Sequence, residues 1–152
     1  MDNCIICKSN LINKKQTIRS RMRDENGKPQ GDMISYKAWC PKCEIYLWKT
    51  NQGKTEGHWR ISMVKESDKI TEICESEFLK IKYTKENELE NIDDKFMCER
   101  ERWIEFIALK KQNDKIYEFS QIAKDYTIRG YVIKRDNYFI GDYITEFEKN
   151  SN

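Results

Sequence analysis

Two Cys-x-x-Cys pairs constrain this chain more than any other feature. Cys4 and Cys7 form the first pair, Cys40 and Cys43 form the second, and no other cysteine lies between them. In a reducing compartment such pairs are more typical of metal-binding or catalytic sites than of disulfides. Two tight turns of this kind can present four sulfurs to one ion. The sequence therefore predicts one structural Zn²⁺ bound by the four cysteines, with an iron site, disulfides or free thiols as the alternatives.

The stretch between the two pairs has the pattern of a long β-hairpin. Residues 16–23 and 33–39 are rich in β-forming side chains, and residues 24–32 between them contain Asn26-Gly27, Pro29 and Gly31. Glycine, proline and asparagine in such a cluster indicate a turn. Residues 44–49, after the second pair, predict a third strand.

Residues 4–49 resemble the zinc-ribbon superfamily. The residues that carry the resemblance are Cys4, Cys7, Cys40, Pro41 and Cys43. The resemblance implies a three-stranded sheet stabilised by zinc, and contact with nucleic acid or with the transcription and translation apparatus. The chain departs from many ribbons after each cysteine pair, where Lys8 and Glu44 stand in place of a glycine that would adopt a left-handed turn.

The charge distribution favours an anionic partner for this first part of the chain. Residues 1–50 contain ten Lys or Arg against five Asp or Glu, whereas residues 51–152 contain 18 against 21. Arginines recur at every second position from 19 to 23, so on a strand they would share one face. The predicted nucleic-acid-binding residues are Lys14, Lys15, Arg19, Arg21, Arg23 and Lys28. The alternative is that these charges are solvated and protect an edge strand from aggregation.

Two further hypotheses concern the same hairpin. It resembles, in part, the ribbon of transcript-cleavage factors of RNA polymerases, because Arg19-Ser20 is followed by the carboxylates of Asp24 and Glu25. That resemblance implies a metal-binding acidic tip, but here three residues separate the two dipeptides. The other hypothesis is a protein-interaction adaptor that makes no contact with nucleic acid.

The rest of the chain predicts a second, β-rich domain over residues 59–149, joined by a polar linker at 51–58. The predicted strands cover residues 59–65, 77–84, 102–111, 115–120, 130–135 and 138–144. The predicted helices cover residues 67–76, 89–101 and 120–126. Hairpins are predicted between the third and fourth of these strands and between the fifth and sixth. The whole is an α+β, β-rich chain: a three-stranded zinc ribbon followed by a mainly antiparallel β domain with one or two short helices.

No enzyme class is indicated by the remaining motifs. The sequence lacks a phosphate-binding loop, a nucleophile elbow and a His-Glu-x-x-His motif, and its single histidine is His58. Cys74 and Cys98 stand alone and are predicted to be small buried side chains. The N-terminus has no signal-peptide pattern, and no apolar run approaches the roughly 20 residues of a membrane span. We therefore expect a soluble cytoplasmic protein that has no membrane partner, no small-molecule substrate and no catalytic residues.

Overall fold

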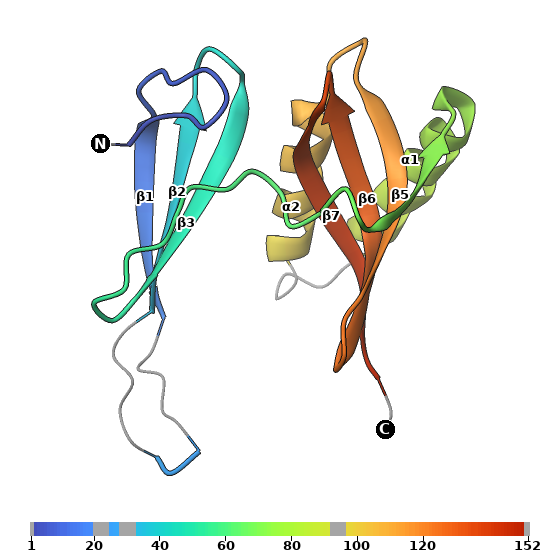
Figure 1. Cartoon of the computed structure of the whole chain (residues 1–152). Coiled ribbons are helices and arrows are strands. Elements are labelled where there is room, and N and C mark those ends of the chain that lie inside the picture. The colour runs from blue at the N-terminus through green and yellow to red at the C-terminus, as the bar shows by residue number, and fades with distance from the viewer. Residues whose placement is uncertain (1, 20–24, 28–32, 92–96, 151–152) are drawn as a thin grey trace. The chain divides into compact units, whose positions relative to one another are not determined.

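The computed structural model describes residues 2–19, 25–27, 33–91 and 97–150. The chain divides into two compact units, Met1–Ile61 and Ser62–Asn152. Each unit contains its own antiparallel sheet (Figure 1).

The first unit is a three-stranded sheet in the order β1-β2-β3, with β1 at Ile12–Arg19, β2 at Met33–Cys40 and β3 at Ile45–Gln52. The predicted three-stranded organisation is confirmed, although β1 begins four residues before the predicted strand. A bulge interrupts β1, because Ile12 pairs with Trp39 while Lys15 pairs with Lys37. Asn13, inside the bulge, has a φ of 54°. The bulge places one extra residue in β1 and so sets which β1 side chains share a face.

One face of this sheet is covered by the chain's own residues. Ala38, Ile45 and Leu47 on this face are at most 1% exposed. The segment after β3 turns back along the sheet: Gln52 and Thr55 exchange two hydrogen bonds, and so do Trp48 and Arg60. The segment can approach the backbone of β3 this closely because Gly57 has no Cβ atom. A Cβ at this position would lie only 2.0 Å from the Thr50 carbonyl oxygen and would clash with it.

Residues 59–65 do not form the predicted strand. Among them, Arg60 makes an isolated bridge to β3, and Ile61 closes the first unit. The alternation of Trp59, Ile61 and Met63 is therefore not the pattern of a single strand, since Met63 belongs to the second unit. Met63 and Ser62 are instead fixed by the Asp142 carboxylate, which accepts hydrogen bonds from the Met63 amide and the Ser62 hydroxyl.

The second unit is a four-stranded antiparallel sheet in the order β4-β5-β6-β7. Its strands are β4 at Lys69–Ile73, β5 at Lys115–Ile122, β6 at Tyr126–Arg135 and β7 at Tyr138–Lys149. The predicted strands at 115–120, 130–135 and 138–144 are confirmed, as is the hairpin between the last two. Two helices, α1 at Glu75–Glu90 and α2 at Met97–Leu109, lie between β4 and β5 in the sequence.

Four further predicted elements, and one predicted hairpin, are wrong. Residues 77–84 belong to α1 and residues 102–109 to α2 instead of to strands, so no hairpin joins 102–111 to 115–120. Conversely, residues 67–76 contain strand β4, and residues 120–126 contain the end of β5, a turn and the start of β6. In α1 the apparent alternation is local, because the buried side chains Phe78 and Leu89 are three helical turns apart. The predicted helix at 89–101 spans the junction of α1 and α2, and residues 92–96 lie outside the described residues.

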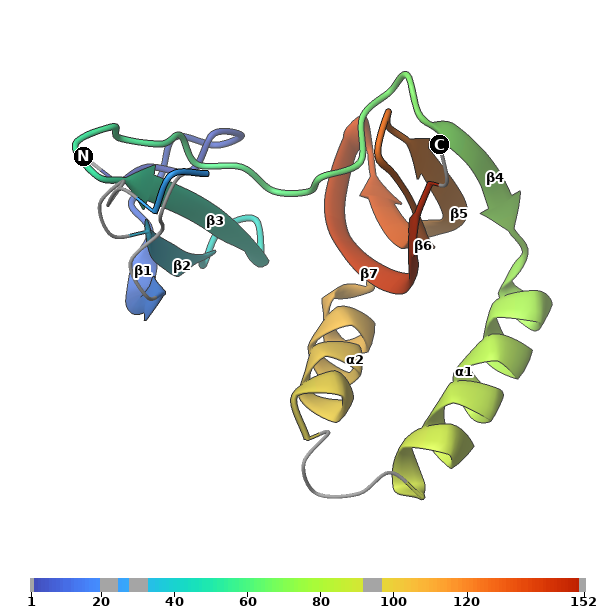
Figure 2. The same cartoon turned by 90° about the horizontal axis from the view of Figure 1, so that it is seen from below.

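The core of the second unit lies on both sides of its sheet. Helix α2 packs Trp103 and Phe106 against Tyr143 of β7, with ring centroids 5.0 and 5.9 Å from the tyrosine ring. On the other side, Val64 packs with Phe119 and Val132 in a second buried cluster. Figure 2 shows the curved sheet with both helices lying away from its concave side.

Candidate metal centre and nucleic-acid interface

The two cysteine pairs lie on two turns with the same local geometry. The Lys8 amide donates to the Cys4 carbonyl over 2.9 Å, and the Glu44 amide donates to the Cys40 carbonyl over 2.8 Å. Lys8 and Glu44 have φ values of 65° and 56°, the left-handed conformation in which many ribbons use glycine. The missing glycines therefore do not alter the turns.

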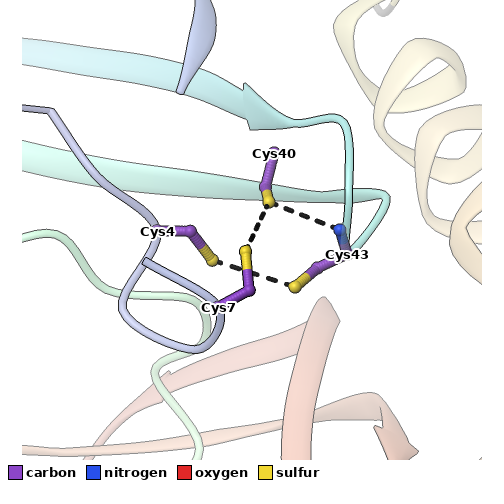
Figure 3. A group of neighbouring side chains, drawn as sticks. All are labelled: Cys4, Cys7, Cys40 and Cys43. Atoms are coloured by element: carbon purple, nitrogen blue, oxygen red, sulfur yellow. Dashed lines mark hydrogen bonds between the residues drawn. The ribbon is translucent and has the colours of Figure 1, made fainter. Parts of the chain in front are cut away.

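The four sulfurs converge on one point (Figure 3). All four Sγ atoms lie within 4.8 Å of one another. The Cys7–Cys40 pair is separated by 3.5 Å and the Cys4–Cys43 pair by 4.0 Å. A tetrahedral ion with bonds of about 2.3 Å to sulfur places its ligands about 3.8 Å apart. The cysteines are thus positioned to coordinate one metal ion.

The environment of the thiols favours a cation among them. Hydrogen bonds from the hydroxyl and amide of Ser9 lower the pKa of the Cys7 thiol to about 6. Burial, by contrast, raises the pKa of Cys40 and of Cys43 above the usual range. The protein alone therefore favours the thiolate at Cys7 and the protonated thiol at Cys40 and Cys43. Because a metal binds thiolates, metal binding at these cysteines would release protons.

Four sulfurs complete a tetrahedral site. Cys4 and Cys40 are fully buried, and the Cys43 amide donates to the Cys40 sulfur over 3.3 Å. If Zn²⁺ is the bound ion, four sulfurs leave no coordination position for water or a substrate. An ion held by all four sulfurs would tie the N-terminal turn to the β2–β3 turn, which are separated by 32 residues of sequence.

No protein-family model, curated protein or solved structure matches this chain. No helix within the described residues combines the length and apolar character needed to cross a membrane.

The predicted nucleic-acid-binding residues fall into two groups. Lys14 and Lys15 are described; Arg21, Arg23 and Lys28 lie outside the described residues, as does the side chain of Arg19 at the end of β1. Asp24 of the predicted acidic tip lies outside them too, while Glu25 is exposed in a turn. The neighbours Lys14 and Lys15 project from opposite faces of the sheet.

The covered face of the sheet pairs its lysines with carboxylates. Lys14 Nζ lies 2.9 Å from the Asp2 carboxylate, and Lys49 Nζ lies 3.1 Å from Glu56 and 3.8 Å from Asp2. The Trp59 indole also donates to Asp2. These hydrogen bonds and the Lys14 charge lower the pKa of Asp2, although burial opposes the shift. Lys14 thus takes part in the contacts that close the covered face.

The opposite face carries cations among aromatic rings. We name it the aromatic face and define it by residues Lys15, Lys37, Trp39, Tyr46, Trp48 and Arg60. Lys37 Nζ lies 4.3 Å from the centroid of the Tyr46 ring and 5.7 Å from that of Trp48. Of these six residues, only Lys15 was among the predicted nucleic-acid-binding residues. The sequence signal that could have indicated the rings is the spacing of Trp39, Tyr46 and Trp48 around the second cysteine pair.

The remaining cysteines and the single histidine lie outside the four-cysteine cluster. Cys74 is exposed at the N-cap of α1, so the prediction that it is buried is wrong. His58 is exposed, and the side chain of Cys98 lies outside the described residues. Sequence reasoning also missed a partly buried polar contact in the second unit, where the Tyr143 hydroxyl donates to Glu99 on α2. The sequence gives no signal for it, because Tyr143 and Glu99 are 44 residues apart and meet only through the packing of α2 on β7.

Proposed function

We propose that the first unit is a zinc-ribbon module that binds nucleic acid, alone or as part of a transcription or replication assembly. In this proposal the metal is a single Zn²⁺ with a structural role, and the second unit is a scaffold with its own core. The observation that carries the nucleic-acid part is a row of three cations across one face of the first sheet: Lys15, Lys37 and Arg60.

The choice of zinc rests on the ligand set. Four thiolates in a tetrahedral arrangement suit Zn²⁺ or an iron centre, and zinc is the commoner structural ion in Cys₄ sites on paired turns. A unit of about 60 residues builds only a small core, so a bound ion supplies much of its folding free energy.

The choice of nucleic acid rests on charge. Register places Lys15 directly opposite Lys37, and the bridge to β3 adds Arg60 in the same row. Lys15 and Arg60, at the two ends of this row, are exposed. A polyanion bound across the row would contact these cations and release its own counterions. The excess of five basic residues in residues 1–50 is consistent with the same partner.

A binding titration tests this proposal. The zinc-loaded full-length chain is titrated into fluorescently labelled single- and double-stranded 20-mers, first at low salt and then at increasing salt. We expect binding at low salt whose affinity falls linearly with the logarithm of salt concentration. Metal analysis of the same preparation should give one zinc per chain. Absence of binding to both oligonucleotides at low salt would refute the nucleic-acid proposal.

A second candidate is a protein-interaction adaptor, which one feature of the second unit favours. Ile122, Tyr126 and Phe147 are exposed there, and the rings of Tyr126 and Phe147 stack with centroids 5.4 Å apart. Exposed apolar groups of this kind are common at protein interfaces. The adaptor predicts that oligonucleotides fail to bind, so the titration separates the two candidates.

A further inference from the structure

We infer that the aromatic face binds single-stranded nucleic acid by stacking bases on its rings and pairing phosphates with its cations. This inference rests on the proposed function and specifies the kind of nucleic acid and the surface that binds it. It moves the binding surface from the hairpin arm at residues 14–28 to the sheet itself.

The cations and one ring of the aromatic face form a single row across the sheet. Lys15 of β1 lies opposite Lys37 of β2, Lys37 opposite Trp48 of β3, and Trp48 opposite Arg60. Neighbouring strands are about 4.8 Å apart, so this row crosses the full width of the sheet. Lys15 and Arg60, at its two ends, are exposed. Positive charge therefore borders the rings on both sides.

The three rings form a contiguous cluster in which neighbouring rings are inclined to each other by 60° and 46°. Trp39 packs edge-on against Tyr46 with centroids 4.6 Å apart, and Tyr46 lies 6.3 Å from Trp48. All three rings are partly buried, and Trp39 lies opposite Tyr46 in the row next to the cations. Aromatic rings on a sheet stack bases of any sequence, because every base has a π-face.

Charge complementarity identifies an anionic occupant. Among the described strand positions of the aromatic face none is acidic, whereas the covered face pairs its lysines with Asp2 and Glu56. A protein partner with an acidic surface would meet the same charge, but it would not need three neighbouring rings. Rings interleaved with cations are the combination that single strands use. A duplex keeps its bases stacked inside and offers the rings little to contact.

The first experiment removes a ring. Trp48→Ala in the full-length, zinc-loaded chain should weaken binding to a labelled single-stranded 12-mer by about tenfold or more, the usual effect of losing one stacked base. Trp48→Phe retains a ring at the same position and should bind within about threefold of the parent chain. One zinc per chain in both variants shows that the first unit remains folded.

The second experiment uses two neighbouring lysines as a matched pair. Lys15→Ala and Lys14→Ala remove the same charge from adjacent positions on opposite faces. Lys15→Ala should weaken single-strand binding and lower the slope of log affinity against log salt by about 0.7, the loss of one phosphate contact. Lys14→Ala should leave that slope unchanged, because Lys14 pairs with Asp2 on the covered face.

The outcomes separate this inference from the proposed function. Preference for single strands, with loss on Trp48→Ala and on Lys15→Ala but not on Lys14→Ala, supports the inference. Binding that Trp48→Ala leaves intact, or that Arg21→Ala and Arg23→Ala together abolish, would overturn the inference while the nucleic-acid function stands. Absence of binding to any oligonucleotide would overturn both.

Discussion

The two units contain similar antiparallel sheets that are stabilised in different ways. In the first unit the buried apolar residues besides cysteine are Ala38, Ile45, Leu47 and Ile61 among the described positions, and none is aromatic. In the second unit Trp103, Phe106, Phe119 and Tyr143 are all at most 3% exposed. Ring burial supplies the second unit with a core of its own. The rings of the first unit are only partly buried, so its buried core consists of those few apolar side chains together with Cys4 and Cys40.

The largest expected effect comes from removing the metal. Cys40→Ser, or a strong chelator, should unfold the first unit, because structural zinc contributes on the order of 10 kcal/mol to modules of this size. The second unit should remain folded. Hydrogen exchange measured by mass spectrometry should show lost protection in residues 33–52 and retained protection in residues 115–149.

Cys74→Ser is the matched control, since it changes an exposed thiol outside the metal site. It should leave both zinc content and exchange protection unchanged. Retained protection of residues 33–52 in a metal-free chain would contradict the assignment of a structural metal.

The second prediction tests whether buried rings stabilise the second unit. Trp103→Ala should lower the free energy of unfolding of the second unit by about 3–5 kcal/mol, the cost of deleting a large buried ring. Zinc content should stay at one per chain. Denaturant unfolding followed by circular dichroism measures the first quantity, and metal analysis measures the second.

Trp103→Phe provides the control for ring packing. It preserves a ring next to Tyr143 and removes an indole N–H that is buried without a hydrogen-bond partner among the described residues. Its cost should be well below that of Trp103→Ala. Equal costs for the two substitutions would mean that packing of the ring is not what stabilises α2 on the sheet.

The smallest expected effect is a pH dependence confined to the second unit. Burial, and then the hydrogen bond to Glu99, raise the pKa of Tyr143 well above its ordinary value of about 10. The unfolded chain loses this proton first as pH rises, so stability is intact below about pH 10 and falls above it. The slope from this group is at most about 1.4 kcal/mol per pH unit.

Tyr143→Phe should reduce this slope when unfolding is measured between pH 9 and 11. Tyr138→Phe removes an exposed hydroxyl from the same strand and serves as the control. Part of the slope should persist in Tyr143→Phe, because burial also raises the pKa of Tyr131. An identical change of slope in both variants would contradict the role of burial.

Sequence reasoning succeeded where chemistry is local and failed where it depends on packing. The cysteine spacing alone identified the four sulfurs that converge, because two short turns fix the geometry of their own ligands. The helices were missed because short windows of α1 and α2 alternate like strands. Only burial against the sheet shows that Trp103, Phe106 and Leu109, spaced by three, lie on one face of a helix.

The aromatic face was missed for a different reason. Its row joins Lys15 and Lys37 to Arg60, and these residues become neighbours only through strand pairing and an isolated bridge. A single sequence carries no local signal for such pairing. The sequence also predicts that both Lys14 and Lys15 bind nucleic acid, although the two side chains project from opposite faces of the sheet.

The bulge in β1 decides which of its side chains lie on the aromatic face. With Ile12 opposite Trp39, the extra residue at Asn13 is what brings Lys15, rather than Lys14, opposite Lys37. Deleting Asn13 would close the bulge and leave Lys15 opposite Lys37, because the strand would then pair with β2 residue for residue. In chains descended from this one, the loss of a single residue between Ile12 and Lys15 is therefore compatible with the aromatic face.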